Sequence, residues 1–224
     1  MKRILNIAHR GFTRDFPDNT LEAFGAAIEI PVDGIECDVH ETADGHFIIF
    51  HDKEIAGRDI SQMSLEEVGQ VKLEGKYRIP TLEQTLELCH DKTLLNIEIK
   101  KVSSLDGFLE LVRARLRPEE VIFSSFDRNI VIGLARLAPE IQRGILSAFE
   151  IKDPVELARS ANSEMVIARF PSVNAEVIRQ MRDAGLMLFI WGCRDMAEVR
   201  SALTMDIDGV ITDFPDEVYK ELHG

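Results

Sequence analysis

Short runs of β-branched and aliphatic residues alternate with longer amphipathic stretches along the whole chain of 224 residues. Apolar residues recur at three- and four-residue spacing in the longer stretches, which is typical of helices that bury one face. Asn19 stands three residues before Glu22 and is expected to cap the first helix. The predicted strands are Ile4–His9, Gly34–His40, Phe47–His51, Leu94–Lys100, Val121–Ser125, Arg143–Leu146, Met165–Phe170, Met187–Trp191 and Gly209–Thr212. The predicted helices cover residues 20–30, 81–90, 106–116, 129–138, 154–161, 174–184, 195–203 and 216–222.

The number of strand–helix units favours a closed parallel sheet. We interpret Phe47–His51 as an additional strand inserted after the second strand of the repeat. The rest of the chain then forms eight strand–helix units of about 29 residues each, and their total is close to the roughly 250 residues of a (β/α)8 barrel. We therefore predict an α/β fold, a single TIM barrel over residues 1–224 with a small insertion at approximately 41–80. A doubly wound open sheet is the alternative, because the same alternation is compatible with it.

Charge and composition exclude several classes of function. The chain has 39 acidic and 26 basic residues, and its formal charge of -13 repels nucleic acid and anionic lipid. No segment reaches the roughly 18 consecutive apolar residues of a membrane helix, and the first apolar stretch is too short for a signal peptide. The three cysteines are too few and too scattered for a disulfide framework or a zinc site. We expect a cytoplasmic protein with no nucleic-acid partner and no stable membrane association.

Two predicted strands carry polar residues at every second position. Strands of a parallel sheet are buried on both faces and normally read as apolar runs, so this pattern needs an explanation. An antiparallel strand with one wet face would produce the same pattern, but helices on both sides of each strand argue against it. The polar residues that share a face are Glu36 and Asp38 in one strand, and Asn96, Glu98 and Lys100 in the other.

The acidic members of these two faces predict a metal site. In a closed barrel Glu36, Asp38 and Glu98 would converge near the carboxyl ends of the strands, where TIM barrels carry their active sites. Carboxylates packed together are unfavourable unless they are protonated or neutralised, and a divalent cation is the simplest counter-charge. Ligation by oxygen alone favours Mg²⁺ or Ca²⁺.

Two histidines and two cations end strands in the same region. His9 and His51 could be structural, but their position beside an acidic cluster favours acid and base catalysis, for which imidazole is well suited near neutral pH. Arg10 and Lys100 either pair with the nearby acids or bind an anionic group such as phosphate. The chain has no glycine-rich phosphate loop, so metal and side chains would hold a substrate phosphate.

The motifs that carry these residues run in a characteristic order from residue 8 to residue 215. They are Ala8-His9-Arg10-Gly11, Pro17 to Phe24, Glu36-Cys37-Asp38-Val39, His51-Asp52, Ile79 to Glu83, Glu98-Ile99-Lys100, Ser124 to Asp127, Trp191 and Asp208 to Pro215. In these motifs, and over nearly its whole length, the chain resembles the glycerophosphodiester phosphodiesterase family.

The resemblance implies a TIM barrel that hydrolyses glycerophosphodiesters, as small-molecule substrates, to glycerol 3-phosphate and an alcohol. The nucleophile is either water or the glycerol hydroxyl of the substrate, through a cyclic phosphate. Neither the alcohol, the metal nor the oligomeric state follows from the sequence. The implied roles are ligation of Mg²⁺ or Ca²⁺ by Glu36, Asp38 and Glu98, general acid and base catalysis by His9 and His51 in either order, and phosphate binding by Arg10 and Lys100.

The sequence departs from the family pattern at three places. Asp18 replaces the usual glutamate, Lys53–Asp59 lacks the common Leu-x-Arg-Thr run, and Gly192-Cys193-Arg194 replaces the commoner Thr-Val-Asn. Because the metal and histidine motifs are intact, these differences bear on substrate choice more than on chemistry.

The sequence also suggests roles for other residues near the predicted site. Trp191 either walls the substrate pocket or packs in the core, and His40 is expected to reach the rim rather than ligate metal. Asp213 either positions the last helix or orients Arg10. Cys37 lies between Glu36 and Asp38 in the strand, so its side chain is on the opposite face and is expected to pack among the helices.

Two alternative functions remain open. A lysophospholipase D-like enzyme would apply the same chemistry to a lipid and would need an exposed apolar rim or an amphipathic docking helix, and the sequence reveals neither. A non-catalytic binder of phosphorylated metabolites is the other alternative, and the intact acids and histidines argue against it.

Overall fold

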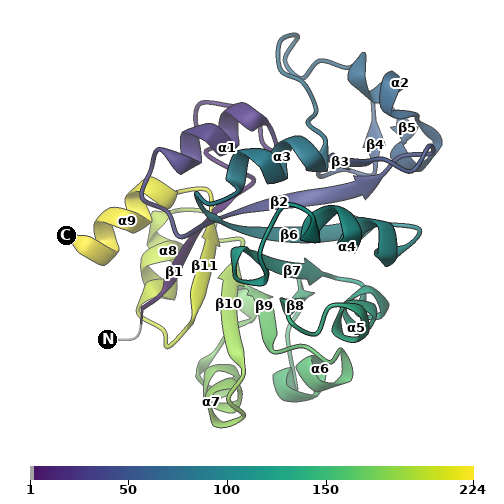
Figure 1. The fold of residues 1–224 in the computed structure, drawn as a ribbon. Helices are drawn as coiled ribbons and strands as arrows, with labels where there is room; N and C mark the ends of the chain where they lie inside the picture. Colours follow the sequence, from purple (N-terminus) through teal and green to yellow (C-terminus); the bar gives the residue numbers. More distant parts are fainter. Residues whose placement is uncertain (1–2) are drawn as a thin grey trace.

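The computed structural model describes residues 3–224 and contains a closed parallel barrel (Figure 1). Strand β1 (Leu5–His9) pairs in parallel with both β2 (Gly34–Glu41) and β11 (Gly209–Thr212), which closes the sheet. The (β/α)8 TIM barrel is thereby confirmed and the open sheet is excluded. Between β2 and β11 the barrel order is β6 (Leu94–Lys101), β7 (Val121–Ser125), β8 (Gln142–Ser147), β9 (Met165–Arg169) and β10 (Met187–Trp191).

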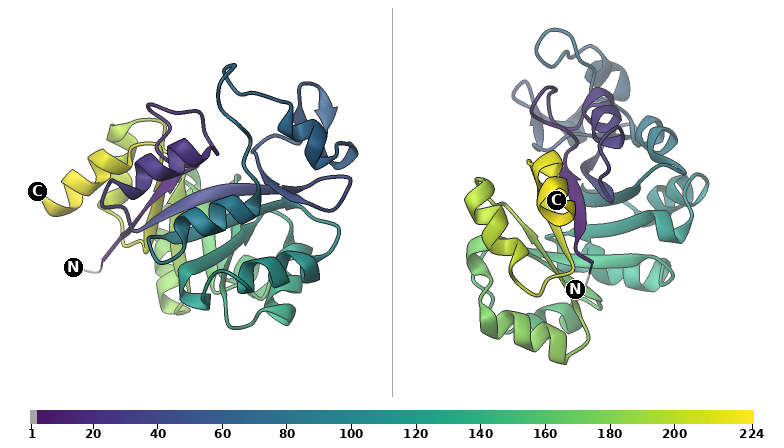
Figure 2. Two further views of the ribbon diagram at one scale, coloured as in Figure 1. Left: turned by 45° about the horizontal axis from the view of Figure 1, so that its top comes forward. Right: turned by 90° about the vertical axis from the view of Figure 1, so that its left-hand side faces the viewer.

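Helices form a layer outside the strands, as two further views show (Figure 2). Most begin at a residue whose side chain accepts a backbone N–H of the first turn, such as Thr81, Asp127 and Asp195. None of the helices within residues 3–224 has the length and apolar character needed to cross a membrane. The helices of this outer layer are α1 (Leu21–Ile28), α3 (Leu82–Cys89), α4 (Leu105–Arg113), α5 (Arg128–Leu137), α6 (Pro154–Ser160), α7 (Ala175–Asp183), α8 (Met196–Leu203) and α9 (Pro215–His223).

The start of α1 differs from the sequence expectation by one residue. Thr20, not Asn19, is the cap, and its hydroxyl accepts the N–H of Ala23 at 3.2 Å. Asn19 instead adopts a left-handed backbone conformation (φ 57°) that asparagine tolerates better than most residues. Its side chain is therefore available for the interior of the barrel.

The apolar core has two layers, because side chains alternate between the two faces of each strand. One layer lies between strands and helices, and it includes buried Cys37, as its parity predicted. Phe108 of α4 is fully buried there against Phe123 of β7, with ring centroids 5.4 Å apart. The other layer fills the barrel and consists of Ile7, Ile122, Leu146, Met165, Ile167, Phe189 and Ile211. This inner layer leaves only the carboxyl ends of the strands for polar side chains.

A small extra unit lies between β2 and α3 and projects beside the barrel (Figure 1). It contains β3 (Phe47–Ile49), which runs antiparallel to β2, the hairpin of β4 (Glu54–Ile55) and β5 (Arg58–Asp59), and helix α2 (Leu65–Gly69). The predicted strand here ends two residues early, at Ile49, so His51 lies in a loop. The hairpin and α2 were not predicted, because elements of two to five residues are too short to show periodicity. The insertion boundaries 41–80 stay a prediction.

Candidate active site

Three carboxylates meet inside the barrel, near the carboxyl ends of two adjacent strands. Glu36 and Asp38 come from β2 and Glu98 from β6, with Asp38 and Glu98 opposite each other in the strand register. One oxygen from each residue lies within 4.8 Å of the others, and all three residues are buried. The structure thus brings together the acids that the sequence pattern placed on one face.

Burial and mutual repulsion control the ionisation of this cluster. Burial raises the pKa of Glu36 well above its usual value, and the neighbouring charges of Asp38 and Glu98 raise it further. Burial also raises the pKa of Glu98, although Lys100 opposes the shift. Burial of Asp38 likewise opposes its ionisation, but Lys100 and Arg10 outweigh that effect and lower its pKa. The metal-free cluster therefore contains acids that a nearby cation would stabilise in their charged form.

The donor set fits a hard divalent cation. Its ligand atoms are all carboxylate oxygens, the ligands preferred by Mg²⁺ and Ca²⁺. Oδ1 of Asp38 and Oε1 of Glu98 are buried, and neither forms a hydrogen bond of good geometry with any residue from 3 to 224. The Nζ atom of Lys100 provides partial charge compensation, at 2.9 Å from the first oxygen and 2.5 Å from the second. These oxygens have unused capacity to coordinate an ion.

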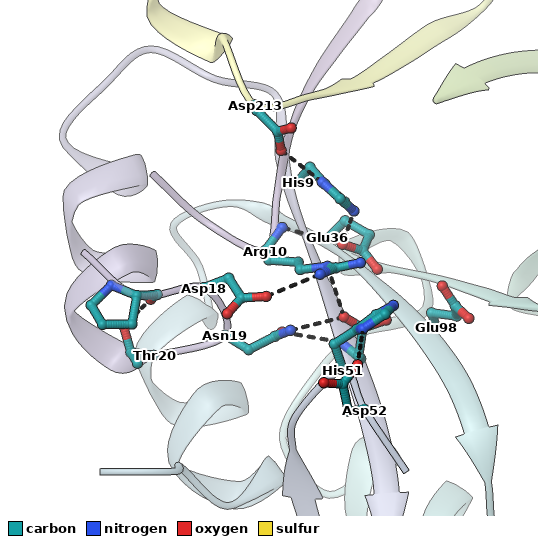
Figure 3. Close-up of polar contacts among 12 residues, drawn as sticks. His9, Arg10, Asp18, Asn19, Thr20, Glu36, His51, Asp52, Glu98 and Asp213 are labelled. Atoms are coloured by element: carbon teal, nitrogen blue, oxygen red, sulfur yellow. Dashed lines mark hydrogen bonds and ion pairs between the residues drawn. The ribbon is translucent and has the colours of Figure 1, made fainter. Parts of the chain in front are cut away.

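His9 enters the site from the end of β1 with a fixed orientation (Figure 3). Its Nδ1 lies 2.7 Å from Oδ1 of Asp213, and because a carboxylate only accepts, Nδ1 carries the hydrogen. Nε2 is on the other side of the ring, 3.9 Å from Oε2 of Glu36. Burial on its own would raise the pKa of Asp213, but the His9 hydrogen bond together with the nearby charges of His9 and Arg10 outweighs it, and the pKa is lowered. The sequence expectations for Asp213 did not include this contact.

His51 reaches the same cavity from the loop after β3. Its Nδ1 lies 2.7 Å from Oδ1 of Asp52, so its Nε2 is also left for other partners. The backbone carbonyl of His51 accepts a 3.3 Å hydrogen bond from Nε2 of His40. His40 is only 5% exposed, and burial lowers its pKa. The expectation that His40 reaches the rim is therefore wrong, because its ring is buried and bonded to the backbone of His51. The register of β2 against β6 shifts between Val39 and His40.

Arg10 and Lys100 are held against the acids rather than free in solvent. Nη1 of Arg10 donates to Asp18 at 3.0 Å, and its Nε lies 3.1 Å from Oδ2 of Asp38. The backbone N–H of Arg10 also donates to Oε2 of Glu36 at 3.2 Å. Both cations line the cavity, so pairing with the acids and contact with a substrate are compatible at this site.

Asn19 is a member of the site that sequence reasoning missed. Its Nδ2 donates to Oδ2 of Asp38 at 2.8 Å, and its Oδ1 accepts the backbone N–H of Asp38 at 3.2 Å (Figure 3). These two bonds fix both the side chain and the backbone of an acid in the cluster. The sequence did contain a signal for this role. Thr20 can cap the helix by itself, so Asn19, directly before it, was free to serve another purpose.

The cavity is bounded on its other side by apolar and aromatic residues. It encloses about 390 Å³, part of it open to solvent, and all the predicted site residues except Asp38 line it. Trp191 forms one wall, with its ring 5.8 Å from that of Phe126 and its Nε1 donating to the carbonyl of Ser147 at 3.3 Å. Phe126 is 45% exposed and Phe149, two residues beyond β8, is 82% exposed. Two exposed phenylalanines thus occur at this end of the barrel, where the sequence pattern did not reveal them.

Comparisons with known proteins match the whole chain. A model of the glycerophosphoryl diester phosphodiesterase family matches residues 9–217. A glycerophosphodiester phosphodiesterase from Caldanaerobacter subterraneus subsp. tengcongensis is 30% identical over 232 residues, which cover 96% of each chain. The crystal structure of a glycerophosphodiester phosphodiesterase from Thermotoga maritima superposes with a TM-score of 0.82 at 29% identity, covering 99% of this chain and 100% of the other.

A more distant structure has the same fold. It is that of a phosphodiesterase from Oleispira antarctica in complex with the product sn-glycerol-3-phosphate, with a TM-score of 0.92, 21% identity, and coverage of 100% of this chain and 98% of the other. The family match spans both histidines, the three carboxylates and the final strand. The chain therefore belongs to the glycerophosphoryl diester phosphodiesterase family and is an enzyme of that class.

Proposed function

We propose that the enzyme hydrolyses glycerophosphodiesters to glycerol 3-phosphate and an alcohol, with Mg²⁺ or Ca²⁺ held by Glu36, Asp38 and Glu98. The observation that supports this most is the convergence of three buried carboxylates and two oriented histidines on one cavity. The product bound to the Oleispira antarctica phosphodiesterase supports the choice of glycerol 3-phosphate. When bound, the cation supplies positive charge that stabilises the phosphate and its transition state.

The cationic side chains position the substrate phosphate. Arg10 offers a planar guanidinium suited to two phosphate oxygens, and Lys100 offers a compact ammonium. Both line the cavity and are held by buried acids, so little side-chain freedom is lost on binding.

The two histidines exchange protons with the reacting groups. One accepts a proton from the nucleophile as its oxygen bonds to phosphorus, and the other donates a proton to the alcohol oxygen as its bond to phosphorus breaks. Such transfers typically contribute about 10²- to 10⁴-fold each. In both His9 and His51 the Nδ1 atom is engaged by an aspartate, so Nε2 is the atom that exchanges the proton.

A hydrolysis assay tests the proposal directly. We expect release of glycerol 3-phosphate from a panel of glycerophosphodiesters when Mg²⁺ or Ca²⁺ is present, and none after chelation. Failure to release glycerol 3-phosphate from any member would contradict the proposed reaction. Trapping of a cyclic phosphate by ³¹P NMR separates attack by the glycerol hydroxyl from attack by water.

The aspartate behind His9 gives a prediction about positioning. Asp213→Asn keeps the shape of the side chain but removes the charge that orients the ring, so kcat is expected to fall about tenfold with KM and Tm unchanged. Asp206→Asn is the control, because Asp206 forms an exposed ion pair with Arg182. Unchanged kcat in Asp213→Asn would show that Asp213 does not position His9 for catalysis.

Repulsion within the carboxylate cluster gives a prediction about stability. The folded protein holds the Glu36 proton more tightly than the unfolded chain, so the stability of the metal-free protein falls as pH rises from the unfolded pKa toward the folded one. Glu36→Gln removes this loss, and with chelator at pH 8 it is expected to stabilise the fold by about 1–3 kcal/mol in urea unfolding.

The pH dependence and the metal response check the origin of that gain. The stability gain of Glu36→Gln should shrink toward pH 4, where wild-type Glu36 is protonated in the folded state and mostly protonated in the unfolded chain. Mg²⁺ or Ca²⁺ should raise the Tm of wild type and raise that of Glu36→Gln much less. Exposed Glu66 provides the control variant Glu66→Gln. A destabilised Glu36→Gln would show that the metal-free cluster carries no net repulsion.

The exposed aromatic residues favour one second candidate, hydrolysis of lysophospholipids. Phe126 and Phe149 lie on loops at the carboxyl ends of β7 and β8 and could contact an acyl chain. Comparing turnover of lysophosphatidylcholine with that of glycerophosphocholine decides between the two substrates.

A further inference from the structure

An arginine that the proposed reaction does not use lies at the mouth of the barrel. Arg169 is the last residue of β9 and is paired in register with Trp191 of β10. Met165 and Ile167 of the same strand fill the barrel interior, so Arg169, two residues further on, projects from the same inner face. It is exposed at the end where the cavity opens.

The guanidinium of Arg169 has no partner among residues 3–224: it forms no hydrogen bond there, and no carboxylate lies within 4 Å. The charge of Arg169 does act on one carboxylate, Glu198 on α8. Hydrogen bonds from Arg194, and to a smaller extent the charge of Arg169, lower the pKa of Glu198. Glu198 is bound by Arg194, whose Nε donates at 2.9 Å and whose backbone N–H donates at 2.8 Å. Arg169 is therefore available to a ligand.

Gly192 provides the space in which the stem of Arg169 lies. Its backbone has φ 74°, and a Cβ added there would approach Cγ of Arg169 to 3.3 Å and Nε to 3.7 Å. A side chain at this position would press on the arginine. Gly192 opens the segment in which the sequence departs from the family pattern, which links that departure to the placement of Arg169.

The acidic residues at the starts of the neighbouring helices are engaged as helix caps. Asp127, Asp153 and Asp195 accept N–H groups at the starts of α5, α6 and α8, where the helix dipole offsets their charge. Exposed Lys152 and exposed Glu150 lie on the β8–α6 loop and balance each other. Arg169 thus adds a positive charge that no ion pair among residues 3–224 neutralises.

We propose that Arg169 is a specificity residue that binds an anionic oxygen group, carboxylate or phosphate, on the leaving alcohol. The inference rests on the proposed function. With the reacting phosphate held by Arg10 and Lys100, an alcohol that leaves the cavity past Trp191 comes within reach of Arg169. A guanidinium matches the two oxygens of a carboxylate or phosphate and repels a quaternary ammonium.

The test compares four glycerophosphodiesters that differ only in the leaving alcohol: glycolate, glycolamide, 2-phosphoethanol and choline. Glycolate and glycolamide have nearly the same shape and differ in charge. We expect kcat/KM of the wild type to favour glycolate over glycolamide about fivefold, on the scale of an exposed ion pair, and less in 0.5 M salt. The 2-phosphoethanol ester shows whether phosphate is preferred to carboxylate, and the choline ester is expected to be the poorest of the four.

Variants assign the preference to Arg169. Arg169→Gln should bring the glycolate to glycolamide ratio to about one and raise the relative rate of the choline ester, whereas Arg169→Lys should retain part of the preference. Arg136→Gln removes an equal charge from an exposed position on α5 and should change nothing.

Three results would overturn the inference: equal rates for glycolate and glycolamide in the wild type, a preference that survives in Arg169→Gln, or a uniform loss on all four esters, which would place Arg169 on the reacting phosphate. If no ester is hydrolysed, the proposed function fails. Calorimetric binding of the glycolate and glycolamide esters to wild type and Arg169→Gln then still decides the role of Arg169.

Discussion

Replacing either His9 or His51 by alanine is expected to lower kcat by at least about 10²-fold while the protein remains folded. Each substitution removes an Nε2 atom that faces the cavity and leaves the aspartate behind it without its partner. The loss should appear in kcat more than in KM, because the proton transfers take place in the transition state. Steady-state kinetics with a glycerophosphodiester measure it.

Controls separate this loss from misfolding. His46 lies in the turn between β2 and β3, and its side chain is half-exposed, so His46→Ala should retain full activity. Far-ultraviolet circular dichroism and Tm of the two site variants should match the wild type, since both rings are partly exposed. Full activity in His9→Ala or in His51→Ala would exclude that residue as acid or base.

Removal of the divalent cation is expected to abolish hydrolysis, and Glu98→Gln is expected to raise the metal concentration needed for half-maximal activity by at least about tenfold. Glu98 contributes one of three buried carboxylate ligands, and a neutral amide oxygen binds Mg²⁺ or Ca²⁺ more weakly. Excess cation should therefore restore much of the rate of the variant. A titration of activity against free metal, with the same titration followed by Tm, measures both effects.

Exposed Glu110 on α4 provides the matched control, and Glu110→Gln should titrate like the wild type. Full activity of the wild type after exhaustive chelation would contradict metal-dependent catalysis. A rate of Glu98→Gln that excess metal does not raise, with metal affinity unchanged, would give Glu98 a role other than ligation.

The alternation of side chains between the two faces of a strand made much of the site predictable. Glu36, Asp38 and Glu98 lie at alternate positions of strands that should be apolar, and this conflict with the burial rule was visible without a structure. The same reasoning placed Cys37 on the opposite face, where the structure has it. Periodicity of 2 and 3.6 residues is a local property of the chain, so local sequence is enough to reveal it.

Contacts between distant segments were not predictable in this way. Asp213 reaches His9 across 204 positions, and Asn19 holds Asp38 across 19 positions. The stem of Arg169 lies in the space that Gly192, directly after the neighbouring strand β10, leaves open. None of these contacts shows as a period in the sequence, since each depends on how the fold brings together segments that are far apart along the chain.

The amino-acid sequence by itself determined the alternation of strands and helices, the inward face of the two strands that carry the acids, and the chemical types of the site residues. These follow from local propensity and from the alternation of side chains along a strand. Only the tertiary structure decided that β1 closes the sheet by pairing with both β2 and β11, and with it which side chains share a partner. Closure is a long-range event, in which burial of the whole inner layer fixes the register, and register in turn determines which carboxylate, imidazole or guanidinium lies within hydrogen-bonding distance of another.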